Sequence, residues 1–420
     1  MKRRDLVRGI AAATGVFAAA GAVNALVSGV RFPVLQAEPD ARARRLHLLD
    51  PDIDVVLDHA YIQDAFRRDG ALHLVLRAFG PTPAMTVVAA SPAVIDVTWR
   101  NIPVRAELEA PNVRIADEQG PTPVNRRLSP EFPAGRHRIG YRVPFADEFA
   151  FTVIGDSGGG SELAWCLERS AHLGADFMLH TGDFYYSQGD FATLPVVLES
   201  SPLPMYATIG NHDFHDGGRL VHRDFVQHIG PRNFAFILGE TMVASFDTAA
   251  STWPASSGDR GELFDALAAR RESYRHLVAM THRPLHDPGL GPDYRDGRTL
   301  SASEVAWVGE RLRRLSAKPV LLVGHIHVSV EMVEDGITTY ISGDGLASRN
   351  LASGRKLARI LLGVKRPGEP PRYDWQPLGI PDSAYCHDKN RRTLELMGKP
   401  YPSGSFGTGC REPGVGASTS

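Results

Sequence analysis

Residues 151–158 read FTVIGDSG, an apolar run of strand length that ends in the polar block Gly155-Asp156-Ser157-Gly158. Four more polar blocks follow apolar runs in the same way: Gly182-Asp183-Phe184-Tyr185-Tyr186, Gly210-Asn211-His212-Asp213, Thr281-His282-Arg283-Pro284 and Gly324-His325-Ile326-His327. Asp, Asn and Gly are common in ordinary turns, so one block alone is a weak signal. Five blocks in this order, all with metal-binding side chains, predict a binuclear metal site that hydrolyses phosphate esters.

The chain around these blocks alternates strands with helices. The expected strands each stop at a block and cover residues 151–154, 177–179, 206–209, 277–280 and 320–323. Helical periodicity covers residues 161–173, 261–274 and 303–315, the last with Ser303 as its expected N-cap. Open α/β sheets bind ligands beyond the carboxyl ends of their strands, so we expect the five blocks to meet at one edge.

The five blocks resemble those of the calcineurin-like metallophosphoesterase superfamily, which read GDxG, GDxxY, GNH, xxxH and GHxH. The resemblance covers about residues 150–350, and the block ending in Tyr186 is similar to that of the purple acid phosphatases. It implies an α/β sandwich of two mixed sheets flanked by helices, and hydrolysis of phosphate monoesters by attack of metal-bound hydroxide on phosphorus. Two alternatives stay open: a phosphodiesterase acting on nucleotides or phospholipid head groups, and a non-catalytic surface-binding protein with a vestigial metal centre.

The resemblance also implies the metal ligands. Asp183 is placed to bridge both ions, because a carboxylate has two oxygens. The remaining ligands are Asp156, Tyr186 and His327 for the first ion, and Asn211, His282 and His325 for the second.

The first block lacks a histidine that is found in a related group of enzymes. Cyclic-nucleotide phosphodiesterases of the superfamily carry Asp-x-His there, whereas this chain has Gly158, which leaves Tyr186 as the available replacement and Tyr185 as the alternative. A phenol with a pKa of about 10 binds as phenolate only beside a strong Lewis acid. This favours Fe³⁺ at the first site, with Fe²⁺, Zn²⁺ or Mn²⁺ at the second.

Other polar residues near the blocks are candidates for substrate contact. His212 follows the ligand Asn211 and is the expected catalytic residue, donating a hydrogen bond to the substrate or a proton to the leaving oxygen. His215 and His286 are candidate substrate contacts, or alternatively solvated or capped histidines. Asp344 is a candidate acceptor behind one of the last two metal histidines, or alternatively an ordinary turn residue.

The N-terminal residues resemble a twin-arginine export signal. Arg3-Arg4 and Arg8 precede a mild Ala/Gly/Val-rich run over residues 10–30, and Val23-Asn24-Ala25 offers a small-residue cleavage site. A retained membrane anchor is the alternative. We expect a signal segment over residues 1–37, the twin-arginine translocation machinery as a partner, a periplasmic or secreted location, and no stable membrane span in the mature form.

Length and patterning predict the remaining organisation. A chain of 420 residues is long enough for two cores. Short alternating runs over residues 38–146 predict an antiparallel β-sandwich, the catalytic domain is expected over 147–365, and residues 366–420 indicate an irregular arm. The chain has 46 Lys+Arg and 48 Asp+Glu residues, and it contains no long run of either charge. This argues against a nucleic-acid polymer as partner. The expected partner is the small phosphate ester that the five blocks and the resemblance imply.

Three cysteines occur in the chain. Cys166 is expected to be a small buried residue, because it lies in a predicted helix. Cys386 and Cys410 are expected to form a disulfide, which export would permit.

Overall fold

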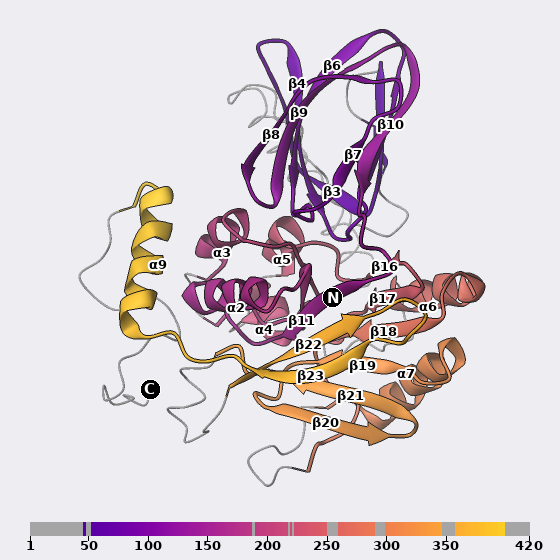
Figure 1. The fold of residues 1–420 in the computed structure, drawn as a ribbon, viewed down its shortest axis with the longest axis vertical. Helices are drawn as coiled ribbons and strands as arrows, with labels where there is room; N and C mark the ends of the chain where they lie inside the picture. The colour runs from indigo at the N-terminus through magenta and orange to yellow at the C-terminus, as the bar shows by residue number, and fades with distance from the viewer. Residues whose placement is uncertain are drawn as a thin grey trace, which may run out of the picture.

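A computed structural model describes residues 45–47, 52–186, 190–216, 219–220, 222–249, 259–289, 299–346 and 358–399. In this part of the chain a β-sandwich lies against one end of a larger α/β domain (Figure 1). The predicted signal segment, residues 1–37, lies outside the described residues. None of the described helices combines the length and apolar character needed to cross a bilayer.

The β-sandwich consists of two five-stranded sheets, in the orders β1-β2-β5-β10-β7 and β3-β4-β6-β9-β8. Its strands are β1 (Arg45–His47), β2 (Ile53–Asp58), β3 (Ala60–Arg68), β4 (Ala71–Ala78), β5 (Ala84–Ala89), β6 (Ala93–Arg100), β7 (Glu107–Glu109), β8 (Arg114–Thr122), β9 (Asn125–Phe132) and β10 (Gly135–Arg142). Alternate residues face inward and surround the buried Trp99. The sandwich is not wholly antiparallel, because β4 and β6 pair in parallel. Between them the chain crosses to the other sheet as β5, so it returns in the same direction.

The α/β domain contains the two mixed sheets expected from the sequence. The first sheet has the order β13-β12-β11-β22-β23 and the second β16-β17-β18-β19-β21-β20. Their strands are β11 (Phe149–Ile154), β12 (Phe177–His180), β13 (Met205–Ala207), β16 (Phe234–Leu238), β17 (Thr241–Ser245), β18 (His276–Met280), β19 (Val320–Val323), β20 (Ser329–Glu334), β21 (Ile337–Ser342), β22 (Arg359–Lys365) and β23 (Arg372–Pro377). A short hairpin, β14 (His215–Asp216) and β15 (Arg219–Leu220), lies outside them.

An aromatic core holds the two sheets together. Phe151 of β11 and Phe177 of β12 stack with ring centroids 5.6 Å apart, and Phe236 of β16 meets Phe177 edge-on at 6.4 Å. All three side chains are buried. Burial of rings of this size is a main source of stability, so the core fixes how the two sheets face each other.

Helices cover the outer faces of both sheets (Figure 1). The described helices of this domain are α2 (Ser161–His172), α3 (Asp190–Glu199), α4 (Asn211–Phe214), α5 (His222–His228), α6 (Asp259–Ala269), the 3₁₀ helix η1 (Arg271–Ser273), α7 (Ala302–Leu315) and α9 (Ser383–Leu396), of which α9 lies against α2 and α3. Apolar residues of α2 and α3 pack on the first sheet, and those of α6 and α7 on the second.

Two predicted helix ends differ from the structure. The helix expected over 261–274 ends at Ala269, because the chain tightens into η1 and directs Tyr274 into the core. The N-cap of α7 is Ser301 rather than Ser303. The backbone of Ser301 is extended, and its hydroxyl accepts from the N–H of Glu304, which is the geometry of a capping residue.

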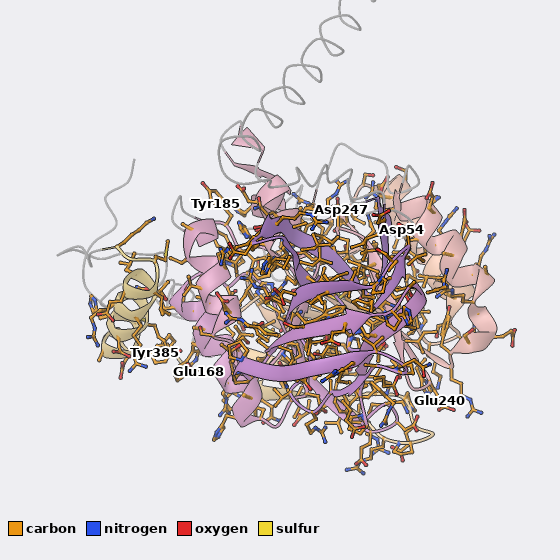
Figure 2. All side chains as sticks on the ribbon, turned by 90° about the horizontal axis from the view of Figure 1, so that it is seen from above. Asp54, Glu168, Tyr185, Glu240, Asp247 and Tyr385 are labelled. Carbon is orange, nitrogen blue, oxygen red and sulfur yellow. The ribbon has the colours of Figure 1, made fainter. Side chains whose placement is uncertain are left out.

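Residues 372–396 are not part of an irregular arm, so that prediction is wrong for them. β23 pairs with β22, and α9 is capped by Asp382, whose carboxylate accepts from the N–H of Tyr385 at 2.7 Å. The Tyr385 hydroxyl donates to Glu168 of α2 at 3.0 Å, and both side chains are labelled in Figure 2. These elements depend on β22 and α2 as partners, which local composition does not reveal.

The cysteines differ in their state. Cys166 is a buried free thiol, and burial raises its pKa above the usual range. Cys386 is buried and disulfide-bonded. Cys410, the remaining cysteine, lies outside the described residues.

Asn101 joins the sandwich to the α/β domain. Its amide nitrogen donates to the carbonyl oxygens of Ala78 and Met205, both at 2.8 Å, and its amide oxygen accepts from the N–H of Met205 at 2.9 Å. The side chain therefore pairs with the edge strand β13 as a neighbouring strand would. Asn101 is buried and has a φ of 65°, a left-handed conformation that Asn adopts more readily than most residues.

We predict that Asn101→Ala lowers the free energy of unfolding by roughly 3 kcal/mol, because it leaves buried backbone groups unpaired. Asn112→Ala is the matched control, since Asn112 is exposed and has a φ of 63°. The control is expected to lose about 1 kcal/mol. Urea unfolding followed by circular dichroism measures both, and equal losses would contradict the docking role.

Candidate metal centre

All five polar blocks lie directly beyond the carboxyl ends of strands. They follow β11, β12 and β13 in the first sheet and β18 and β19 in the second. Because these strands are parallel within each sheet, their ends meet at one edge of the α/β domain. The structure thus brings the blocks together.

Three of the predicted ligands have an uncommon backbone conformation. Asp156, Asp183 and His325 have φ angles of 61°, 65° and 66°. This left-handed region costs non-glycine residues roughly 1–3 kcal/mol each, and such residues cluster at functional sites. Gly210 permits one of these turns, because a Cβ atom there would lie 2.0 Å from Oδ1 of Asp183. Backbone strain is therefore concentrated where the side chains converge.

One group of side chains gathers around the Tyr186 hydroxyl. This oxygen lies 3.1 Å from Oδ1 of Asp156, 3.1 Å from Oδ2 of Asp183 and 3.3 Å from Nε2 of His327. Tyr185, the alternative in the sequence, belongs instead to the hydrophobic cluster under α2 and α3. The first group thus contains the donors expected for the first ion.

The second group gathers around His282. Its Nε2 lies 2.9 Å from Oδ1 of Asn211 and 3.3 Å from Oδ2 of Asp183, and its Nδ1 lies 2.7 Å from the carbonyl oxygen of Thr181. Ligand atoms of Asp183, His282 and His325 all lie within 4.8 Å of one another. Asp183 belongs to both groups. Imidazole and carboxylate donors fit iron, zinc and manganese, so the residues present could hold two such ions.

Asp183 and His282 form a buried charge pair when no metal is bound. Burial opposes ionisation of Asp183, but the charges of His282, His212 and His325 hold its pKa well below the usual range. Burial likewise disfavours the charged form of His282, but Asp183 raises its pKa to about 9. A metal ligand must be a neutral imidazole, so a metal held by His282 would displace a proton from that ring.

Tyr186 keeps its proton in the absence of a metal. Burial, followed by the charges of Asp156 and Asp183, raises the pKa of its phenol well above the usual range. Ionisation of this phenol therefore requires a strong positive charge beside it.

Asp213 is a site residue whose role the sequence did not reveal. Its buried carboxylate accepts four backbone hydrogen bonds of 2.6–3.0 Å, from the N–H groups of Gly210, Asp183, Phe184 and Tyr185. Burial, with the charge of Asp183, raises its pKa to about 7. Asp213 therefore fastens the second block to the third. Its place beside the predicted ligand Asn211 and the candidate His212 was the one available signal.

His180 links the first and second blocks, and it too was missed. Its Nδ1 accepts from the N–H of Gly182 at 3.1 Å, which leaves the proton on Nε2, 2.8 Å from the Ser157 hydroxyl. Burial lowers its pKa to about 3, so the ring is neutral. In the sequence it is one polar residue at the end of an apolar strand.

The three candidate histidines that are not predicted metal ligands differ in their position relative to the two ligand groups. The backbone N–H of His212 donates to Oδ1 of Asp183 at 2.9 Å, and its ring lies 4.6 Å from that of Tyr186. His286 lies instead near Glu334 and Asp335, at the end of β20 remote from the blocks. The side chain of His215 lies outside the described residues.

Asp344 lies in the turn after β21. Its carboxylate accepts from the hydroxyl of Ser329 and from the N–H of Arg359 at 3.4 Å. Support of a metal-binding histidine by Asp344 stays a prediction.

The side chains that converge at this edge could hold metal ions, and a comparison with protein families identifies the class of the domain that carries them. Residues 149–329 match the family model described as calcineurin-like phosphoesterase. This domain of the chain belongs to that family, whose members are two-metal-dependent hydrolases of phosphoesters. No curated protein sequence matches the chain.

Several solved structures are similar in fold. A purple acid phosphatase from yellow lupin seeds is 12% identical, with 71% of this chain and 70% of that chain covered and a TM-score of 0.46. PhoD is 10% identical, with 69% and 83% covered and a TM-score of 0.42. A dimetal phosphatase from Danio rerio is 9% identical, with 55% and 96% covered and a TM-score of 0.41.

Proposed function

We propose that the protein is an exported acid phosphatase that hydrolyses phosphate monoesters at a centre with Fe³⁺ at the first site and Fe²⁺, Zn²⁺ or Mn²⁺ at the second. The observation that carries the proposal is the Tyr186 hydroxyl, 3.1 Å from both Asp156 and Asp183. Without a metal this phenol is protonated, because burial and both carboxylates raise its pKa. A trivalent ion stabilises the phenolate better than a divalent one, which favours iron.

The side chains divide the chemical work. The bound ions would supply Lewis acidity for the phosphoryl oxygens and acidify a water molecule. Asp183, which contacts both ligand groups, would keep the ions adjacent. His212 lies half-buried beside Tyr186 and is the candidate to donate a hydrogen bond to the substrate or a proton to the leaving oxygen.

We extend the proposal to export through the twin-arginine machinery, which the Arg3-Arg4 pair and the mild apolar run after it support. The protein is then expected in the periplasm or the medium. Replacing both arginines with lysine is expected to keep it in the cytoplasm, as cell fractionation would show. Unchanged export of that variant would contradict this part.

The metal assignment predicts a colour. Iron-loaded wild-type protein is expected to absorb visible light through a phenolate–iron bond, and Tyr186→Phe is expected to lose that band. Tyr185→Phe, which removes a neighbouring phenol hydroxyl, is expected to keep it. Spectra of the three proteins at equal iron content decide the matter. A colourless iron-loaded wild type, or a coloured Tyr186→Phe variant, would contradict the assignment.

The proposed reaction predicts which class of ester is hydrolysed faster and how two histidine variants change kcat. Metal-loaded wild-type protein is expected to hydrolyse a mono-aryl phosphate faster than a bis-aryl phosphate. His212→Ala is expected to keep its metals but lose roughly a hundredfold in kcat on a monoester with a poor leaving group. His286→Ala is the control, since that side chain lies by Glu334 and Asp335. Faster hydrolysis of the diester would favour the phosphodiesterase alternative. Inactivity on both ester classes would favour the non-catalytic alternative with a vestigial metal centre.

A further inference from the structure

The outer face of the β3-β4-β6-β9-β8 sheet of the sandwich (Figure 1) carries a pocket of about 450 Å³. Its described lining comes from β3, β4, β6 and β9 and includes none of the predicted metal ligands. Phe66, in this lining, lies on β3 roughly 20 Å from Ala60, which pairs with Ala78 at the junction with the α/β domain. Pockets of this volume are large enough for a small ligand. The pocket is therefore a candidate binding site apart from the metal centre.

A row of side chains crosses four strands in this pocket. Phe66 of β3 pairs with His73 of β4, which pairs with Asp96 of β6. The rings of Phe66 and His73 stack with centroids 5.0 Å apart. Nδ1 of His73 lies 3.4 Å from Oδ2 of Asp96, and the hydroxyl of Ser129, on β9, donates to Oδ1 of Asp96 at 2.5 Å. These contacts fix the orientation of the side chains before any ligand binds, which lowers the entropy cost of binding.

Two arginines line the pocket from opposite corners of this row. Arg68 lies two residues beyond Phe66 on β3, and Arg127 lies two residues before Ser129 on β9. Both side chains are exposed, and among the residues that the structure describes neither guanidinium has an ion pair or a hydrogen bond. Cζ of Arg68 lies 5.5 Å from the centroid of the Phe66 ring. Asp96 is the one carboxylate in the described lining, so the two arginines leave the pocket with an excess of positive charge.

The lining combines groups that bind anions with groups that bind hydroxyls. A guanidinium matches a carboxylate in charge and geometry. The carboxylate of Asp96 accepts hydrogen bonds, and the hydroxyl of Thr98 both donates and accepts them. A carboxylated ligand that also has hydroxyl groups satisfies both sets. Acidic saccharides have this chemistry.

The spacing of the two arginines favours several charges over one. β4 and β6 lie between β3 and β9, so the backbones of Arg68 and Arg127 are roughly 14 Å apart across the sheet. A chain of uronic acids presents carboxylates along its length, whereas a single carboxylate or phosphate ion does not. A nucleic-acid strand also has spaced charges, but it binds through bases that stack on aromatic rings. The Phe66 ring is already stacked on His73 and has Arg68 over it, which argues against a nucleic acid.

We propose that this pocket binds an acidic saccharide, in which Arg68 and Arg127 bind carboxylate groups of different sugars and Asp96 accepts from a hydroxyl group. The sandwich then attaches the α/β domain to a carboxylated polysaccharide. This inference does not rest on the proposed phosphatase activity, because the pocket shares no described residue with the metal centre.

The test titrates trigalacturonate, and maltotriose as a neutral trisaccharide, into the full-length protein by calorimetry at about 150 mM salt, where exposed charges are screened. Wild-type protein is expected to bind trigalacturonate roughly tenfold or more tightly than maltotriose. Arg68→Gln and Arg127→Gln are each expected to weaken trigalacturonate binding about tenfold through loss of a charge-assisted hydrogen bond. Arg136→Gln is the matched control, because Arg136 is exposed on β10 of the other sheet and has no ion pair within the described residues. It is expected to match the wild type, and circular dichroism checks that each variant is folded.

Asp96→Ala separates recognition of hydroxyls from simple attraction of charge. If Asp96 accepts from a hydroxyl, this variant binds trigalacturonate about three- to tenfold more weakly. If the pocket only attracts anions, removal of a negative charge strengthens binding. Tighter binding by Asp96→Ala, unchanged binding by both arginine variants, or equal wild-type affinity for maltotriose would overturn the proposal. So would a wild-type protein that binds neither trigalacturonate nor trimannuronate, or that binds a thymidine oligonucleotide of equal charge as tightly.

Discussion

The carboxylate of Asp183 is the interaction on which the rest of the site depends. One oxygen lies 3.1 Å from the Tyr186 hydroxyl and 3.3 Å from Nε2 of His282, and the other accepts the backbone N–H of His212 at 2.9 Å. The carboxylate therefore connects predicted metal ligands from both sheets. Burying a carboxylate is costly unless opposite charge compensates it. Histidines supply that charge in the metal-free protein, and the ions would supply it in the loaded enzyme.

Holding this carboxylate requires the rest of the domain. Asp183 has a strained φ of 65°, and its backbone N–H is fixed by the buried Asp213. His180 ties the same turn to the first block through Ser157. Neither residue is an expected metal ligand, yet both fix the turns that carry ligands. The strain is tolerated because the surrounding hydrogen bonds leave the turns no alternative.

The sequence predicts those features of the fold and the site that depend on a local pattern of residues. The α/β class and the positions of the blocks after strands followed from apolar runs that end in polar turns, and Tyr186 was singled out because position 158 is glycine. Contacts between distant segments were not readable. Asp213 gains its role from N–H groups in another loop, α9 from its contact with α2, and Asn101 from β13. The parallel β4–β6 pair also depends on a crossover that strand patterns do not reveal.

The central claim is that Asp183 lies between two metal ions. Anomalous X-ray diffraction from crystals of the purified protein, collected on both sides of the iron and zinc absorption edges, tests it most directly. The account predicts two anomalous peaks, both within bonding distance of the Asp183 carboxylate, with iron on the Tyr186 side. A single peak, or peaks away from Asp183, would contradict it.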